Sequence, residues 1–373
     1  MQPEKVEVRI AGKSVTGFLG YEADSNVLIP ADIFSFRLAD VRPEFKEFDQ
    51  FQLFINDQLE MTGVVDHVEL AYEKGHAETV VTGRDLMGLV VDSSVMPAHG
   101  DLNTLKNITV KELAKKLLKN IPFINLKAVV HGKELPSSQR KPNYHKASGP
   151  SLFPNGINEN PHDIQLTPGE SIFKTLSDFA QRNGHLFWCN PDGTFVFDTL
   201  KDSSTPAVFS FYLLKPSSAD PRATDKNNIL RGRFVSDGSK RYSTITVLGH
   251  WESLEGNMSL DYNPHSSATD STVPFYKPLL LITEASSIPD CKQHVEWEIK
   301  KRATEAFKLE YTVAGHSQNG VNYMANSICS VKDEKFGLNG NYLILGRKFI
   351  MDKIQGQKTI LTIGKIAEGY SVA

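Results

Sequence analysis

Apolar and polar residues alternate over short stretches near both ends of the chain, and this period of two predicts β-strands. Near the N-terminus Val6, Val8 and Ile10 alternate with polar residues. Further strands are expected at 51–55, before an Asn56-Asp57 turn, and in a hairpin that pairs 64–70 with 78–82 across 74–76. Towards the C-terminus the pattern predicts strands over 326–332, 342–351 and 358–363, with turns at 338–341 and 355–357.

Two of these hairpins, 63–83 and 340–364, resemble each other. They are similar in length, and each has a glycine near its turn. Each also carries a Thr-x-x-Thr on its return strand, formed by Thr79 and Thr82 in one and by Thr359 and Thr362 in the other. Similar units at two places in one chain indicate an internal duplication. The sequence therefore predicts two similar β modules, one near each end.

Helical spacing of apolar residues appears in three segments between these hairpins. Thr109 and Glu112 form a capping box ahead of a helix over about 110–118. A third helix is expected from Pro289 to about 307, with an apolar stripe that includes Val295 and Ile299. These helices favour an α/β region inside an otherwise β-rich chain.

The segment 167–197 has the clearest local signals. Thr167 is expected to cap the second helix, with Pro168 at its first position, Glu170 in a capping box and Gly184 ending it. Two short strands, 185–188 and 194–197, are then expected to pair across a turn at 190–193. All these signals specify shape, and none forms a reactive set.

These elements predict an α+β, mainly β fold, with two similar β-barrel domains near the chain ends and α/β domains between them. Residues 1–95 are expected to form the first barrel and 96–205 an α+β domain with an exposed loop at 132–160. A connector at 206–227 leads to the second barrel at 228–373, which carries a helical and loop insertion around 250–307.

Composition is that of an ordinary folded, soluble protein. The 373 residues are 40% hydrophobic and 23% charged, with a formal net charge of −3, so charge gives no argument for nucleic-acid or membrane binding. There is no signal-peptide pattern and no run of roughly 18 apolar residues, so no membrane insertion is expected. The three cysteines, Cys189, Cys291 and Cys329, are odd in number and far apart, which favours a reducing compartment such as a bacterial cytoplasm.

Motifs for common chemistries are missing from the sequence: there is no zinc-protease, phosphate-loop, dinucleotide-binding or nucleophile-elbow pattern. Gly315 and Gly320 have phosphate-loop spacing, but Val321 stands where a lysine is required. A loop that joins two strands is the expected structure there.

Two pairs, Asp66 with His67 and His250 near Glu252, could each be half of an acid–base pair. A lone histidine in a strand is more often a surface residue or one with its hydrogen bonds satisfied. Neither pair therefore predicts catalysis.

His294 and Glu298 lie one helical turn apart with Glu296 between them, but without a third ligand a solvated helix face is expected. Cys189 has no nearby positive charge to lower its pKa. We therefore predict no catalytic, cofactor-binding or metal site and no cofactor, and the interface residues stay unassigned.

The loop 132–160 is basic, and its one aromatic residue within that cluster is Tyr144. A solvated surface or a protein-docking surface is favoured over nucleic-acid contact. Its basic residues are Lys133, Arg140, Lys141, His145 and Lys146. Among the larger aromatics, Phe187 and Trp188 are expected in a core, and Trp251 and Trp297 in a core or at an interface.

Three stretches together resemble a known family. They are similar to the baseplate hub proteins of Mu-like contractile-tailed bacteriophages. The stretches are the one from 168–172 through Gly184 to 191–194, the segment 82–94, and 340–344 followed by 356–359 and Leu361. The T-even phage hub and the N-terminal part of type VI secretion spike proteins look like relatives. The resemblance spans nearly the whole chain, and the loop 132–160 matches least.

This resemblance implies a homotrimer in which each chain gives two β-barrels to a ring, and it transfers no catalytic residues. The expected protein is thus a non-enzymatic component of a phage or prophage tail baseplate. It would be a pseudo-sixfold hub ring that joins the tail tube to the central spike, and DNA would pass through its lumen without specific binding. Its expected location is the virion baseplate, after assembly in the host cytoplasm.

Two other functions stay open at this point. A receptor- or carbohydrate-binding module of the tail would use exposed Trp251 or Tyr144 to stack on sugar rings. A tail-associated cell-wall hydrolase would need two carboxylates, or a metal or cysteine set, brought together by folding.

Overall fold

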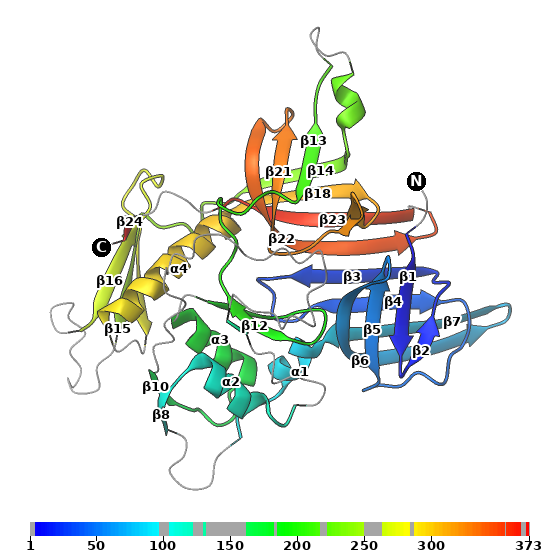
Figure 1. Ribbon diagram of the computed structural model, residues 1–373, viewed down its shortest axis with the longest axis horizontal. Coiled ribbons are helices and arrows are strands. Elements are labelled where there is room, and N and C mark those ends of the chain that lie inside the picture. The colour runs from blue at the N-terminus through cyan, green and yellow to red at the C-terminus, as the bar shows by residue number, and fades with distance from the viewer. Residues whose placement is uncertain are drawn as a thin grey trace.

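Strands dominate the computed structural model, in which four α-helices occur among the described residues (Figure 1). The structure describes residues 4–96, 104–121, 130–131, 162–182, 185–216, 222–249, 263–283, 287–354, 356–366 and 371–372. The predicted mainly β, α+β class is therefore confirmed.

The first β module contains seven strands in the order β3-β4-β7-β6-β5-β1-β2. These are β1 (Val6–Ile10), β2 (Lys13–Val15), β3 (Gly20–Asn26), β4 (Ile33–Leu38), β5 (Gln50–Ile55), β6 (Gln58–Glu73) and β7 (His76–Asp85). Asn56 and Asp57 both have positive φ, as expected for the tight turn between β5 and β6.

The second β module contains six strands in the order β14-β18-β23-β22-β21-β13. These are β13 (Phe209–Leu213), β14 (Ile229–Ser236), β18 (Phe307–Ala314), β21 (Ser327–Asp333), β22 (Leu338–Asp352) and β23 (Gly356–Gly364). Strands β3 and β22 pair with each other, so both modules belong to one 13-stranded sheet.

The two modules repeat each other in strand order and in register. Six strands of the first, β3-β4-β7-β6-β5-β1, correspond in order to the six strands of the second. Strand β6 has one extra residue, Asp66, opposite β7, and β22 has one extra residue, Leu345, at the matching place opposite β23. One difference is that β1 runs antiparallel to β5, whereas β13 runs parallel to β21.

The threonine pattern in the sequence has a structural counterpart. The hydroxyl of buried Thr79 donates to the carbonyl oxygen of Asp40, and that of buried Thr359 donates to the carbonyl oxygen of Gly315, both at 2.6 Å. In each module this bond ties the return strand of the long hairpin to the chain just after its other neighbour, to the second residue after β4 and to the first after β18. The same bond at matching positions supports an internal duplication.

Two closed barrels were expected, and in this respect the prediction is not confirmed, because no sheet among the described residues is closed. The reason lies in the pairing of β3. Its outer edge pairs with β22 over Gly20–Asn26 and is therefore occupied by the other module. A barrel closes only when its two edge strands pair with each other.

One hydrophobic core serves both modules. Its largest fully buried side chains include Phe34, Phe36, Phe51, Tyr311 and Phe349, which come from both ends of the sequence. Burying one such side chain contributes about 1.5–3 kcal/mol, so the shared core gives the modules a common source of stability.

A second layer is formed by α and β elements from the described residues between 86 and 198, shown in cyan and green in Figure 1. It contains α1 (Leu86–Asp92), β8 (Thr104–Ile108), α2 (Val110–Leu118), β9 (Val130–His131), β10 (His162–Gln165), α3 (Ile172–Arg182), β11 (Leu186–Cys189) and β12 (Phe195–Asp198). The predicted capping box of α2 is confirmed, because Thr109 and Glu112 each bond the other's backbone N–H. The helices and strands share a core that is separate from that of the β modules.

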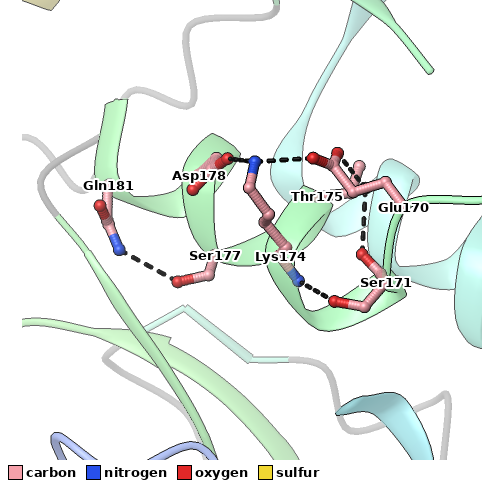
Figure 2. A network of polar contacts seen from close by, with 7 residues as sticks. All are labelled: Glu170, Ser171, Lys174, Thr175, Ser177, Asp178 and Gln181. Atoms are coloured by element: carbon pink, nitrogen blue, oxygen red, sulfur yellow. Dashed lines mark hydrogen bonds and ion pairs between the residues drawn. The ribbon is translucent and has the colours of Figure 1, made fainter. Parts of the chain in front are cut away.

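Helix α3 begins later than the sequence predicts. Its N-cap is Ser171, whose hydroxyl accepts from the Lys174 N–H at 3.1 Å, so the expected cap at Thr167 is wrong (Figure 2). Gly169 has a φ of +90°, which keeps 167–170 in a turn before the helix. Glu170 therefore lies outside the helix and accepts from Lys174 and Thr175. The predicted end at Gly184 lies outside the described residues.

A smaller layer, on the left in Figure 1, is formed mostly by elements between β14 and β18 in the chain, with one strand from the C-terminal end. The strands β15 (Thr244–Gly249), β16 (His265–Thr269), β17 (Pro278–Thr283) and β24 (Ser371–Val372) form a sheet in the order β17-β15-β16-β24. Helix α4 (Ile288–Ala306) covers it, with Cys291, Val295 and Ile299 packed against the strands. The short elements η3 (Ala223–Lys226), β19 (Ser317–Gln318) and β20 (Val321–Asn322) complete the described chain.

The expected turn at 338–341 is a second correction. Asn339 and Gly340 lie within β22, where Gly340 pairs with Val331. The turn comes earlier, because the carboxylate of Asp333 accepts from the N–H groups of Lys335 and Phe336. A side-chain cap of this kind decided the turn position over the Asn-Gly preference.

Candidate functional site

Buried polar side chains connect the two β modules at their junction. Strand β22 changes partner along its length: its first half pairs with β21, and its second half pairs with β3. The change falls at Gly346, where a Cβ atom would lie 2.8 Å from Asn26 Nδ2 and 2.9 Å from Ser25 O. Glycine is therefore required for the two modules to approach each other here.

A buried ion pair crosses the junction. Arg347 Nη2 of β22 lies 2.6 Å from Glu60 Oε2 of β6, and only 6% and 8% of these side chains are exposed. Asn322 Nδ2 donates to the other carboxylate oxygen of Glu60 at 2.6 Å and to Ile55 O at 3.0 Å. The guanidinium also lies over the Phe349 ring, 4.1 Å from its centroid. These contacts fix how the modules are oriented, because a buried charge is tolerated only with its partners in place.

A fully buried histidine forms the centre of a second cluster. His316 Nε2 lies 2.7 Å from Tyr21 Oη, and Nδ1 lies 3.1 Å from Thr359 Oγ1. The Thr359 hydroxyl donates to Gly315 O, so its oxygen accepts from Nδ1–H, and Nε2 accepts the Tyr21 hydroxyl. Burial, followed by the charge of Arg347, lowers the pKa of His316 to about 3. The neutral ring thus links β3 of one module to β23 of the other.

The start of the chain is attached to the second module. Glu4 accepts through its carboxylate from the His316 N–H and the Ser317 hydroxyl. Gln357 accepts from the Glu4 N–H at 2.7 Å and donates to the Glu4 carbonyl at 2.8 Å. These bonds connect residues more than 300 positions apart, so the first strand of the chain depends on the second module for its position.

Two carboxyls, buried Asp85 and half-buried Asp32, lie where the chain leaves the first module. Asp85 caps α1 by accepting from the Met87 N–H at 3.1 Å, and its own N–H donates to the Asp32 carbonyl at 3.0 Å. Burial is the main cause that raises the pKa of Asp32 to about 6 and the pKa of Asp85 well above its usual value. This cap explains why the apolar run 86–91 turns into a helix directly after β7.

Of the two predicted acid–base candidates, only Asp66 with His67 lies among the described residues. Asp66 binds Arg84 through both carboxylate oxygens, at 2.7 and 3.0 Å, and Arg84 also binds Asp92. Asp66 therefore fixes Arg84, which holds the end of α1 against the hairpin, while His67 is the next strand residue and exposed. The other pair, His250 and Glu252, lies outside the described residues.

Two further candidates have structural partners. Glu298 pairs with Arg302 at 2.5 Å on α4, and His294 lies edge-on to Trp297. Cys189 is buried, and burial followed by the charges of Asp85 and Asp32 raises the pKa of its thiol. The described residues contain no group of three or more side chains able to hold a metal ion.

The remaining predicted features fall in turns and cores. Asn319 and Gly320, both with positive φ, form the tight turn between β19 and β20, so the expected strand-connecting loop is confirmed. Phe187 is buried and stacks on Phe197, with 4.5 Å between ring centroids. Trp188 is half-buried, and Trp251, Tyr144 and the basic loop 132–160 lie outside the described residues. No helix in the described ranges has the length and apolar character needed to cross a bilayer.

Glu60, Asn322, His316 and Arg347 are the residues that the sequence analysis missed. One signal was available for Arg347, because strand alternation puts it on the same side of β22 as Phe349 and Met351. A charged residue on the apolar side of a predicted strand needs a partner. The sequence gives no indication that this partner is Glu60, which is 287 positions away.

Among the described residues, the polar interior joins the two β modules of a mainly β protein. Comparison with known proteins shows which proteins share this architecture. Residues 5–85 match the family described as Mu phage baseplate assembly protein GpP-like, N-terminal. The resemblance to Mu-like baseplate proteins is thereby confirmed for the first β module.

Solved structures extend the likeness to the whole chain. A tail protein from Neisseria meningitidis MC58 is 27% identical, with a TM-score of 0.75 and 97% of each chain covered. The 43 kDa tail protein of prophage MuSo2 from Shewanella oneidensis is 19% identical, with a TM-score of 0.73 over 97% of this chain and 98% of that one.

The fold is also shared with a secretion-system protein. A component of the E. coli type VI secretion system is 12% identical, with a TM-score of 0.54 over 97% of this chain and 77% of that one. That protein is described as structurally similar to the T4 bacteriophage tail proteins gp27 and gp5. A search of curated proteins found no match. The chain is thus similar to structural tail and baseplate proteins.

Proposed function

We propose that this protein is the hub of a phage or prophage tail baseplate, a homotrimeric ring that joins the tail tube to the central spike. The observation that carries the proposal is the repetition of strand order, β-bulge and threonine bond in the two β modules. Three chains with two similar modules each would present six similar units to a sixfold tube. The same trimer would present threefold symmetry to the spike.

The rigid junction supports this role. A ring of alternating modules closes only when the angle between neighbouring modules is fixed. The shared core, the β3–β22 pairing and the Glu60–Arg347 pair supply that constraint within one chain. The role needs no catalysis, so we propose a non-enzymatic protein without a cofactor.

The partners follow from the position in the tail. The ring would contact the spike on one face and the tube or adjacent baseplate proteins on the other, and DNA would pass through its lumen without specific binding. The protein would be located in the virion baseplate, after assembly in the host cytoplasm. Its domains would be those expected from the sequence, with ring domains at 1–95 and 228–373, an α+β domain at 96–205 and a connector at 206–227.

Sedimentation equilibrium of the purified chain, alone and with its spike and tube proteins, tests the proposal. We expect a mass three times that of the chain, in the free state or in the complex. A chain that stays monomeric at all concentrations, both alone and with its spike and tube proteins, would contradict a trimeric hub.

A further inference from the structure

Strands β6 and β14 each have an unpaired edge among the described residues. Strand β6 pairs with β5 only as far as Val64, so beyond the bulge its residues 67–73 pair with β7 alone. Strand β14 pairs with β18 alone. Figure 1 shows the β6–β7 hairpin reaching out at the right-hand side of the molecule. An unpaired edge of this length is a template for pairing with another strand.

The pairing inside the chain indicates what these edges fit. Strand β22 corresponds to β6, and β3 corresponds to β14, and within one chain the end of β22 pairs with β3. The matching bulges align β22 with β6 residue by residue, so that Phe349 of β22 corresponds to Leu70 of β6. Strand β3 pairs with β4 as β14 pairs with β18. These pairings match β3 to β14 residue by residue, so that Ala23 corresponds to Phe234. The chain therefore contains a template for a contact whose two halves are both exposed.

On the basis of the proposed ring, we infer that residues 68–73 of one copy pair antiparallel with residues 231–236 of a second copy. In this register Leu70 lies opposite Phe234, as Phe349 lies opposite Ala23 within the chain. Glu73 lies opposite Arg231 at one end, and Val68 lies opposite Ser236 at the other. The contact would repeat around the ring and alternate with the internal β22–β3 contact.

Exposed apolar side chains support this surface. Leu70 is 42% exposed, Tyr72 86% and Phe234 37%, and all three would lie on the side of the strands that corresponds to buried Phe349. Tyr72 would lie opposite Gly232, whose nearest rings are those of Tyr311 and Phe336. Pairing would therefore bury aromatic and aliphatic surface that a single copy leaves in water.

Charge complementarity favours the same register. Inside the chain Lys348 of β22 binds Glu22 of β3, with 2.6 Å between Nζ and Oε2. The corresponding residues of the proposed contact are Glu69 and Arg233, which reverse both signs and have no ion-pair partner among the described residues. A first module placed against another first module would bring Glu69 to Glu22. Because like charges across a strand pair are unfavourable, the reversal favours alternation of the two modules.

Cysteine cross-linking of the full chain tests the register. In the variant Leu70→Cys/Phe234→Cys, mild oxidation should join copies into a ladder that ends at a covalent trimer on a non-reducing gel. The matched control is Leu70→Cys/Val235→Cys, which moves one cysteine to the other face of β14 and should give little or no ladder. Native Cys189, Cys291 and Cys329 are buried and should not contribute.

The outcomes separate this inference from the proposed function. No ladder in a chain that sediments as a trimer overturns the inferred contact and leaves the hub proposal intact. A ladder of the tested pair that continues past the trimer supports the strand contact and contradicts threefold closure. Equal cross-linking of the two cysteine pairs overturns the register.

A charge exchange provides a second test without cysteines. Glu69→Arg and Arg233→Glu should each weaken self-association by about tenfold or more over the copies of the contact, and the double exchange should restore most of it. Glu47→Arg, at an exposed loop position, is the control and should have no effect on association. Failure of the double exchange to restore association would contradict pairing between these two residues.

Discussion

Arg347 and Glu60 are 287 positions apart in the chain and form a buried ion pair with 2.6 Å between Nη2 and Oε2. Each belongs to a different β module, and Asn322 satisfies the other oxygen of the carboxylate. The pair therefore reports whether the two modules are in their correct relative position. This dependence leads to a first prediction.

Replacing Arg347 by Met should destabilise the protein by about 3–5 kcal/mol, because it leaves the Glu60 carboxylate buried without its cation. Glu60→Gln added to Arg347→Met should recover part of the loss, since no buried charge then remains. Urea unfolding measures both effects. Asp57→Asn, which breaks the exposed pair with Lys5, is the control and should cost less than about 1 kcal/mol. Equal losses for the buried and exposed pairs would contradict the account.

The neutral state of His316 predicts a dependence on pH. The pKa is about 6.5 in the unfolded chain and about 3 in the folded protein, so the unfolded chain binds more protons between these values. The stability that rests on neutral His316 is therefore complete above pH 6.5 and is lost as the pH falls towards 3.

The variant His316→Gln isolates this contribution from that of the other groups. The difference in unfolding free energy between the native protein and the variant should shrink by about 2–3 kcal/mol from pH 7 to pH 4. Urea unfolding at several pH values measures it. A difference that stays constant over this range would mean that His316 is not held neutral.

Gly346 predicts a steric effect at the junction. An alanine Cβ would come within 3 Å of Asn26 and of the Ser25 carbonyl oxygen, so Gly346→Ala should push β22 away from β3 and cost roughly 1–3 kcal/mol. Gly238→Ala is a matched control, because its Cβ would meet no atom within 4 Å. Thermal unfolding of the two variants should separate them clearly, and equal melting temperatures would argue against a close strand contact at Gly346.

The start of α3 can be tested directly. Ser171→Ala removes the hydroxyl that accepts from the Lys174 N–H and should cost about 1 kcal/mol. Thr167→Ala changes an exposed turn residue and should stay within about 0.5 kcal/mol of the native protein. Chemical unfolding gives both values. A larger loss for Thr167 would restore the cap that the sequence predicts.

Local features were the most predictable from the sequence. The capping box of α2 and the Asn56-Asp57 turn depend on residues close together, and both are present. The Thr79 and Thr359 similarity was also visible, because matching bonds in two modules require matching residues. The Asn339-Gly340 turn was wrong because pairing with β21 and the Asp333 cap outweighed a dipeptide preference.

The junction was not predictable in the same way. Glu60, Asn322 and Arg347 come together only after both modules fold, and each by itself is an ordinary polar residue in the sequence. The closed barrels were an expectation for a single module taken alone. That expectation did not include the pairing of the outer edge of β3 with β22.

The most direct test of the central claim is electron microscopy of the purified chain, with its spike and tube partners added if it does not assemble alone. The account predicts ring-shaped class averages with six similar lobes around a central hole, two lobes from each of three chains. Compact particles with neither a ring nor a sixfold arrangement of lobes, in both preparations, would contradict it.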